Sequence, residues 1–209
     1  MATGKFITLE GVEGVGKTTN LEFLCDLLAE QGIPFETTRE PGGTPLAEAI
    51  RELVLSPREE TVDGLCELLL VFAARAQHLA QKIKPILATG TWVVSDRFTD
   101  ATFAYQGAGR GLDKQAILQL ETLVQGQLQP DFTLYLDCPP EIGLARAKQR
   151  DSLDRIEQES IAFFNRVRDG YFERAKQHPK RFATVDASTT LDQVQKQIRL
   201  VCHERLGFA

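Results

Sequence analysis

Residues 11–18 constrain the fold of this chain more than any other part of its sequence. They read Gly-Val-Glu-Gly-Val-Gly-Lys-Thr and match the pattern G-x-x-x-x-G-K-[ST] in full. The match lies between a short apolar run at 6–9 and a helical pattern at 17–31, which is the strand–loop–helix context that the pattern requires. Glycines let the backbone curl so that successive N–H groups converge at the positive end of a helix. We therefore predict a phosphate-binding loop.

The lysine and threonine that close this loop have separate expected tasks. Lys17 should place its charge on the β- and γ-phosphates of ATP, and the Thr18 hydroxyl should ligate Mg²⁺. The alternative is a glycine-rich turn with a surface lysine, which could have the same sequence. Such a turn would not require a strand before it and a helix after it. The other residues of the predicted ATP site are Gly11, Val12, Glu13, Gly14, Val15 and Gly16.

Apolar strands alternate with helical patterns along the whole chain of 209 residues, and no repeat or linker interrupts them. Strands that are apolar without alternation are typical of a parallel sheet covered on both faces. We predict one doubly wound α/β domain, 1–209, of the P-loop type, with a five-stranded parallel sheet and helices on both faces. The expected strands are 6–9, 34–38, 92–95, 132–137 and 182–185. The expected helices include 17–31, 45–55, 64–87, 114–125 and one that begins at 140.

Charge and cysteine usage exclude several classes of function. The net charge is −5, whereas binding to duplex nucleic acid or to a membrane surface favours a basic face. No apolar run approaches the length of a membrane span, and no signal peptide is recognisable. The four cysteines are far apart and have no histidine at ligand spacing, which argues against zinc and disulfides. We expect a cytoplasmic protein that binds neither nucleic acid nor membrane.

Two arginines follow strands of the predicted sheet. Arg39 comes after the second strand, and Asp96-Arg97 ends the third. Ligands of open α/β sheets bind at the carboxyl edge, and a guanidinium can grip a phosphate with two parallel hydrogen bonds. An exposed ion pair at a strand end is the alternative for Asp96 and Arg97.

Four further strings carry a resemblance to a known family. They are Arg-Glu-Pro-Gly-Gly at 39–43, Asp-Arg-Phe at 96–98, Ala-Tyr-Gln-Gly at 104–107 and Leu-Asp-Arg-Ile-Glu-Gln-Glu at 153–159. In this order after the phosphate loop, they make the sequence resemble the bacterial thymidylate kinases over nearly its whole length. The resemblance implies transfer of the γ-phosphate of MgATP to dTMP, giving dTDP and ADP, with Mg²⁺ as cofactor, ATP and dTMP as substrates, and a homodimer.

The resemblance also implies a set of dTMP-binding residues. Both arginines after the strands would hold the 5′-phosphate, and Asp96 would help Thr18 organise the metal. Phe72 would stack on thymine while Arg75 bonds its edge, although the family more often spaces this pair by four residues, which would select Val71. The complete predicted set is Glu13, Arg39, Arg51, Phe72, Arg75, Arg97, Thr102, Tyr105 and Gln106.

Gly14 departs from the acid–arginine pair that the eukaryotic class of the family has in this loop. The catalytic arginine must then come from elsewhere. The resemblance implies a fold of the P-loop kinase type with a short mobile lid, and the charged segment at about 146–157 is the lid expected to supply this arginine. Arg155 is the first candidate and Arg150 the second, beside Lys17 and Arg97 as the other catalytic residues. A solvated charged face is the alternative for this segment.

Two other functions remain open on the sequence. The first is a kinase for a different nucleoside or nucleotide. The second is a P-loop switch or assembly ATPase, although neither Asn-Lys-x-Asp nor Asp-x-x-Gly occurs in the chain.

Overall fold

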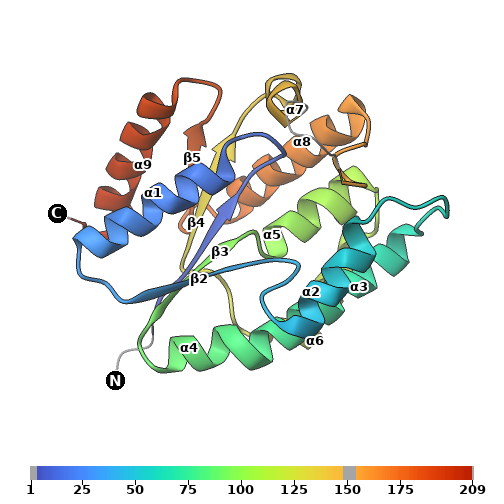
Figure 1. The fold of residues 1–209 in the computed structure, drawn as a ribbon, viewed down its shortest axis with the longest axis horizontal. Helices are drawn as coiled ribbons and strands as arrows, with labels where there is room; N and C mark the ends of the chain where they lie inside the picture. Colours follow the sequence, from blue (N-terminus) through green and yellow to red (C-terminus); the bar gives the residue numbers. More distant parts are fainter. Residues whose placement is uncertain (1–3, 148–153, 209) are drawn as a thin grey trace.

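Five parallel strands form the centre of the molecule, in the order β2-β3-β1-β4-β5 (Figure 1). The structure is a computed structural model and describes residues 4–147 and 154–208. The strands span Phe6–Glu10 (β1), Phe35–Arg39 (β2), Trp92–Asp96 (β3), Phe132–Asp137 (β4) and Phe182–Asp186 (β5). The predicted α/β fold with a five-stranded parallel sheet is confirmed.

Burial differs between the middle and the edges of the sheet. Every residue of β1 is buried, as its uninterrupted apolar character requires. β2 is an edge strand, and its polar residues Glu36 and Thr37 are exposed. The polar residues of β2 thus agree with its place at the edge of the sheet.

Helices cover both faces of the sheet. On one face lie α1 (Lys17–Glu30) and α9 (Leu191–Leu206), which Figure 1 shows side by side. Ile7 packs in one apolar cluster with Leu24 of α1 and Ile198 of α9. Its neighbour Phe6 points to the opposite face, because side chains alternate along a strand, and there it packs against Leu79 and Ile83.

The predicted helix at 64–87 is confirmed, with one interruption. It consists of α3 (Gly64–His78), the π-helical turn η1 (Leu79–Ile83) and α4 (Lys84–Ala88). Pro85 lies at the start of α4, and proline has no N–H and clashes with the carbonyl four residues earlier in a regular helix. The wider π turn stands directly before it and absorbs this mismatch.

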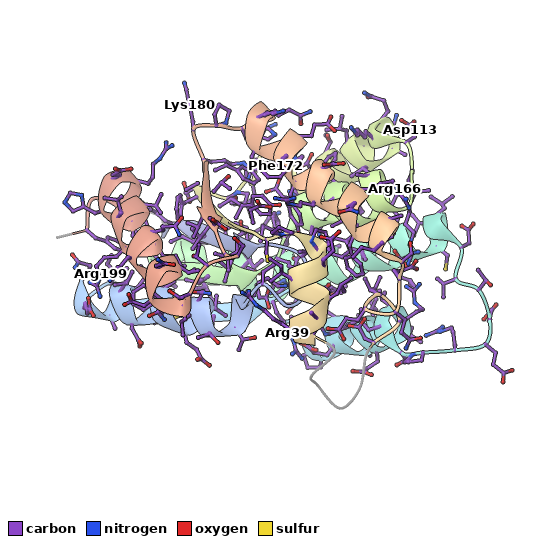
Figure 2. The ribbon with its side chains drawn as sticks, turned by 90° about the horizontal axis from the view of Figure 1, so that it is seen from above. Arg39, Asp113, Arg166, Phe172, Lys180 and Arg199 are labelled. Carbon is purple, nitrogen blue, oxygen red and sulfur yellow. The ribbon has the colours of Figure 1, made fainter. Side chains whose placement is uncertain are left out.

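The remaining helices complete the two outer layers. Three of them follow residues whose side chains accept a hydrogen bond from the first helical turn, as N-caps do: Thr44, Asp113 and Ser160. Side chains fill the interior, whereas Lys180 and Arg199 project from the surface (Figure 2). Over the described residues, we find no helix with the length and apolar character that a membrane span requires. The helices that complete the outer layers are α2 (Pro45–Leu55), α5 (Thr99–Thr102), the π-helical η2 (Phe103–Gly109), α6 (Lys114–Gln125), α7 (Pro140–Ala147) and α8 (Ile161–Gln177).

Candidate active site

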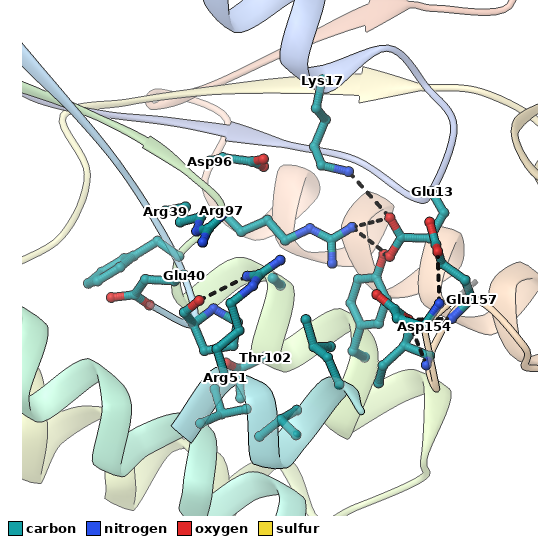
Figure 3. Close-up of a pocket in the computed structure, with 18 of the residues that line it drawn as sticks. Glu13, Lys17, Arg39, Glu40, Arg51, Asp96, Arg97, Thr102, Asp154 and Glu157 are labelled. Atoms are coloured by element: carbon teal, nitrogen blue, oxygen red, sulfur yellow. Dashed lines mark hydrogen bonds and ion pairs between the residues drawn. The ribbon is translucent and has the colours of Figure 1, made fainter. Parts of the chain in front are cut away.

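A cavity of about 630 Å³ opens at the carboxyl edge of the sheet (Figure 3). The strand register brings its walls together, because Leu9, Asp96 and Arg39 are successive partners across β1, β3 and β2. The residues that follow these strands therefore meet at one edge, although they lie far apart in the chain. The residues that line the cavity form two chemically different ends, one at the glycine-rich loop and one between α3 and η2.

The glycine-rich loop joins β1 to α1, and its backbone requires glycine. Gly14 and Gly16 have positive φ angles of 69° and 86°, which only glycine adopts without cost. A Cβ atom on Gly14 would lie 1.8 Å from the carbonyl oxygen of Gly143 in α7. Arginine cannot occupy this position while α7 packs against the loop, so the departure noted in the sequence has a steric reason.

Lys17 reaches back over the loop that precedes it. Its Nζ donates to the carbonyl oxygens of Gly11 at 3.3 Å and Val12 at 3.2 Å, and it lies 3.5 Å from Glu13 Oε2. Burial, reinforced by the neighbouring positive charge of Arg97, lowers the pKa of Lys17. The ammonium is thus held by two backbone carbonyl oxygens and one carboxylate at the mouth of the loop. Gly11, Val12 and Val15 contribute to the shape of the loop but do not line the cavity.

Arg97 contacts the same carboxylate as Lys17 (Figure 3). Its Nη2 lies 2.7 Å from both carboxylate oxygens of Glu13, and its guanidinium stacks 4.6 Å from the ring centre of Tyr105. Burial disfavours the charge on Glu13, but the positive charges of Arg97 and Lys17 outweigh this and lower its pKa to about 2. The Tyr105 hydroxyl donates to the same carboxylate at 3.0 Å. Arg97, Glu13 and Tyr105 thus form one preorganised group.

The backbone at Arg97 is unusual. Its φ angle is +70°, the one positive value at a non-glycine residue in the described chain. Phe98 N–H, just after it, donates to Glu10 Oε1 at 2.8 Å, and Tyr171 O–H donates to Glu10 Oε2 at 2.9 Å. Burial and the nearby charge of Asp100 raise the pKa of Glu10 to about 8. A buried carboxyl group therefore holds the backbone that aims Arg97 into the cavity.

Asp96 and Thr18 satisfy the conditions for a Mg²⁺ site. Both line the cavity, and Asp96 Oδ1 is buried without a hydrogen-bond partner among the described residues. An unpaired buried carboxylate oxygen is costly and suits a hard cation, which prefers oxygen ligands. Thr18 supplies a hydroxyl in the first turn of α1. These residues fit the predicted metal.

At the other end of the cavity, Arg75 is buried and firmly held. It is 1% exposed, and it donates from Nε to Glu40 Oε2 at 2.7 Å and from Nη2 to Thr102 Oγ1 at 3.0 Å. His78 Nδ1 lies 2.9 Å from the second oxygen of Glu40. Within the described residues, Arg75 Nη1 has no partner, although Arg75 lines the cavity. Arg75 therefore brings a buried guanidinium with one unpaired donor to this end of the cavity.

The structure separates two candidates for the residue beside the base. Phe72 packs in the core with Leu68, Phe103 and Ile117 and does not line the cavity. Val71, one residue earlier in α3, does line it. Phe72 is therefore not in the position expected for a residue that stacks on the base. Because it lies one residue after Val71, it points to a different side of α3, where the Arg75 guanidinium lies 4.8 Å from the centre of its ring.

Most of the predicted substrate residues meet at this cavity. Arg39 lies on its rim, where it pairs with Glu48 at 2.8 Å and is about half exposed. Arg51 donates to the carbonyl oxygen of Pro41 at 2.9 Å, which orders the loop after β2. The predicted residues that line the cavity are Glu13, Gly14, Gly16, Lys17, Thr18, Arg39, Arg51, Arg75, Asp96, Arg97, Thr102, Tyr105 and Gln106.

Arg155 has a different position from the one expected for a catalytic lid residue. Its Nε donates to the Val54 carbonyl oxygen at 2.9 Å, and its Nη2 donates to Glu67, while it does not line the cavity. The physical reason is the turn at Asp154, which caps the following N–H groups and directs Arg155 to a buried carboxylate. Arg150, the second candidate, lies outside the described residues, as does the middle of the expected lid, 148–153. Arg146 of α7 does line the cavity.

Three buried acids with evident structural roles were absent from the predicted site: Glu10, Glu40 and Glu67. Glu40 stands inside the Arg-Glu-Pro string, so its motif could have indicated it. Glu67 lies on the buried face of α3 beside Leu68 and Val71, and a charge among buried apolar residues is a signal for a buried polar contact.

Known proteins share this architecture and sequence. The thymidylate kinase family model matches residues 9–198. The chain belongs to the thymidylate kinase family. A thymidylate kinase from Teredinibacter turnerae is 59% identical over 94% of this chain and 96% of its own length, and one from Chromohalobacter salexigens is 59% identical over 99% of both. The crystal structure of the Ehrlichia chaffeensis thymidylate kinase has a TM-score of 0.73 at 34% identity, and the match covers 95% of this chain and 99% of that one. The expected membership of a nucleotide kinase family is confirmed.

Proposed function

We propose that this chain transfers the γ-phosphate of MgATP to dTMP, forming dTDP and ADP. Membership of the thymidylate kinase family supports this reaction, and the two ends of the cavity match its two substrates. The glycine-rich loop suits the triphosphate of ATP, and the buried wall between α3 and η2 suits a nucleobase.

Arg75 is the observation that supports the acceptor most directly. Its Nη1 is a buried donor without a partner in the described chain, held in place through Glu40 and Thr102. Thymine presents the O4 acceptor where cytosine presents an N4 amino donor. A guanidinium can only donate, so this wall favours thymine or uracil over cytosine. Val71 would contribute the apolar contact with the base.

The reaction brings two anionic phosphates together, so the main task of the protein is to position them and to neutralise their repulsion. Lys17 and Arg97, which both pair with Glu13, supply positive charge. Bound Mg²⁺, held by Asp96 and Thr18, would supply further charge neutralisation and orient the phosphates. The acceptor phosphate has a second pKa of about 6, so no general base is needed. We further propose that Arg150 and Arg146 contribute the lid charge, and that Arg155 holds the lid base.

Two other parts of the proposal concern assembly and location. A homodimer is supported by large apolar side chains exposed on neighbouring helices. Free cysteines support a reducing compartment such as the cytoplasm. The exposed leucines are Leu46 and Leu53 of α2, Leu65 and Leu69 of α3, and Leu118 and Leu123 of α6.

A substrate panel tests the proposed function. ADP release from MgATP would be measured with dTMP, dUMP, UMP, CMP, AMP and GMP offered separately. We expect dTMP to give the highest kcat/KM. Equal efficiency with UMP or CMP would refute the thymidylate assignment, and ADP release that is independent of any acceptor would indicate an ATPase. An Arg75→Met variant should lose most of its preference for dTMP, because the donor at the base edge is gone.

A further inference from the structure

Glu67 of α3 is a fully buried carboxylate, 0% exposed, at the base end of the cavity. Three side chains from two separate parts of the chain donate to it. Gln106 of η2 donates from Nε2 to Oε1 at 2.9 Å, Arg110 donates to both carboxylate oxygens at 3.2–3.3 Å, and Arg155 donates to Oε2. A buried charge is tolerated only when its partners are this complete. Glu67 therefore lies at the centre of a built network, next to but not on the cavity wall.

The ionisation state of Glu67 determines what it can bond. Burial raises its pKa, but the hydrogen bonds from Gln106, Arg110 and Arg155 outweigh this, and the pKa lies below its ordinary value. Glu67 is thus ionised at neutral pH, and an ionised carboxylate accepts hydrogen bonds but donates none. The side chain of Gln106 must therefore turn its NH₂ group toward Glu67.

This constraint decides which end of the Gln106 amide a ligand meets. Gln106 lines the cavity, and its carbonyl Oε1 lies at the end opposite the bond to Glu67. Across residues 4–147 and 154–208, no side chain or backbone group donates to this oxygen. The amide therefore presents an acceptor, and Arg75, which lines the same wall, retains one buried donor, Nη1, without a partner among the described residues.

A donor beside an acceptor matches one kind of base edge. Thymine and uracil have a keto oxygen next to an N–H group, which is complementary to Arg75 and Gln106. Cytosine has an amino group next to an unprotonated ring nitrogen, so both of its groups are mismatched. A site that leaves buried polar groups unpaired with the wrong substrate can discriminate by about 10⁴-fold or more. The discrimination depends on an amide that does not rotate.

We propose that Glu67 is a positioning residue that sets base specificity by holding the Gln106 amide with its carbonyl toward the substrate. Glu67 acts through Gln106 and does not touch the base. The inference rests on the proposed function, since it assumes that the base of the acceptor lies against Arg75 and Gln106. Arg110 and Arg155 stabilise the charge of Glu67 and have no part in reading the base.

The test compares Glu67→Gln with Arg110→Gln. A glutamine at position 67 nearly preserves the shape but can both donate and accept, so the Gln106 amide becomes free to turn over. Arg110→Gln removes an ion pair from the same network but retains the bond between Glu67 and Gln106. The ratio of kcat/KM for dTMP to kcat/KM for dCMP would be measured for the parent and for both variants, with folding checked by circular dichroism.

We expect Glu67→Gln to lower this ratio about tenfold or more. This corresponds to the loss of one correctly oriented hydrogen bond (~1.4 kcal/mol). Part of the change should be a higher KM for dTMP. Arg110→Gln should keep the ratio within about twofold, under ~0.5 kcal/mol. A purely structural role would lower both efficiencies by the same factor and leave the ratio unchanged, which would overturn the proposal. An equal fall in the ratio for Arg110→Gln would also overturn it.

Two further conditions keep the result interpretable. If Glu67→Gln does not fold, the double variant Glu67→Gln/Arg110→Gln replaces it, because it removes one of the cations that the lost carboxylate leaves unpaired. The same expectations then apply to the ratio. Failure of the parent protein to use dTMP at all would refute the proposed function, whereas a parent that uses dTMP and a Glu67→Gln variant with the parental ratio would refute only the role of Glu67.

Discussion

Replacement of Arg97 by glycine and by alanine separates the effect of losing the guanidinium from the effect of the strained backbone at this position. Both variants lose the guanidinium that binds Glu13 and lies over Tyr105. They differ in the backbone, because φ at this residue is +70° and only glycine adopts such an angle freely. We expect both to lose phosphoryl transfer by about 10²-fold or more, comparable to removal of one transition-state donor, and Arg97→Gly to be the more stable of the two.

The stability difference follows from two opposing terms. A side chain in the left-handed region costs roughly 1–2 kcal/mol, and glycine avoids this. The greater freedom of glycine in the unfolded chain lowers its stability by about 0.4–1 kcal/mol relative to alanine. The net advantage of Arg97→Gly is therefore about 0.5–1 kcal/mol, which raises Tm by roughly 1–4 °C in a protein of this size. Losses from the unpaired Glu13 are the same in both variants and cancel.

Thermal unfolding by circular dichroism and steady-state ADP release measure the two effects on the same samples. Arg199 in α9 provides the control, since it is an exposed helical residue. At this position the alanine variant should be more stable than the glycine variant by about 1 kcal/mol. The order of stability should therefore be opposite at positions 97 and 199. If alanine is the more stable substitution at both positions, the strained backbone is not a property of the protein. Near-parental turnover in either Arg97 variant would exclude Arg97 from the catalytic group.

Three further predictions concern the loop, the base and the buried acid. Lys17→Ala should fold normally and lower kcat by about 10²-fold or more, because the charge on the β- and γ-phosphates is removed; near-normal turnover by folded protein would contradict the role of the loop. With the parent protein, dUMP should remain a substrate with kcat/KM about 5- to 150-fold below dTMP, since one methyl group is worth ~1–3 kcal/mol; competition assays would measure this. Glu10→Gln should remove a pH dependence of stability. The folded pKa of Glu10, about 8, lies above its unfolded value, so its stabilising contribution is complete below about pH 4.3 and is lost as the pH rises through 8, with a slope of up to ~1.4 kcal/mol per pH unit. Denaturant titrations from pH 5 to 8.5 should show the free energy of unfolding of the parent falling relative to that of the variant as the pH rises. The same pH dependence in both proteins would refute a neutral Glu10.

Properties that depend on neighbours in the chain could be inferred from the amino-acid sequence. The glycine-rich loop is contiguous, and a strand and a helix flank it, so residues 11–18 indicated both its shape and its ligand. The alternation of apolar strands with helices predicted the sheet, since burial on both faces demands this pattern. The strand ends at Arg39 and Asp96 were then brought to one edge by parallel pairing alone, and the cavity lies there.

Contacts between distant segments required the folded chain. The sequence could not place Arg155 against Glu67, 88 residues away, because a charged side chain has many possible partners and packing selects among them. Likewise, the choice between Val71 and Phe72 depends on a rotation of about 100° around a helix, which is set by how α3 rests on η2 and α6. In the sequence, no motif distinguishes the buried acids Glu10 and Glu67 from other glutamates. Their chemistry arises from desolvation and from donors on other elements, and these exist only once the chain is folded.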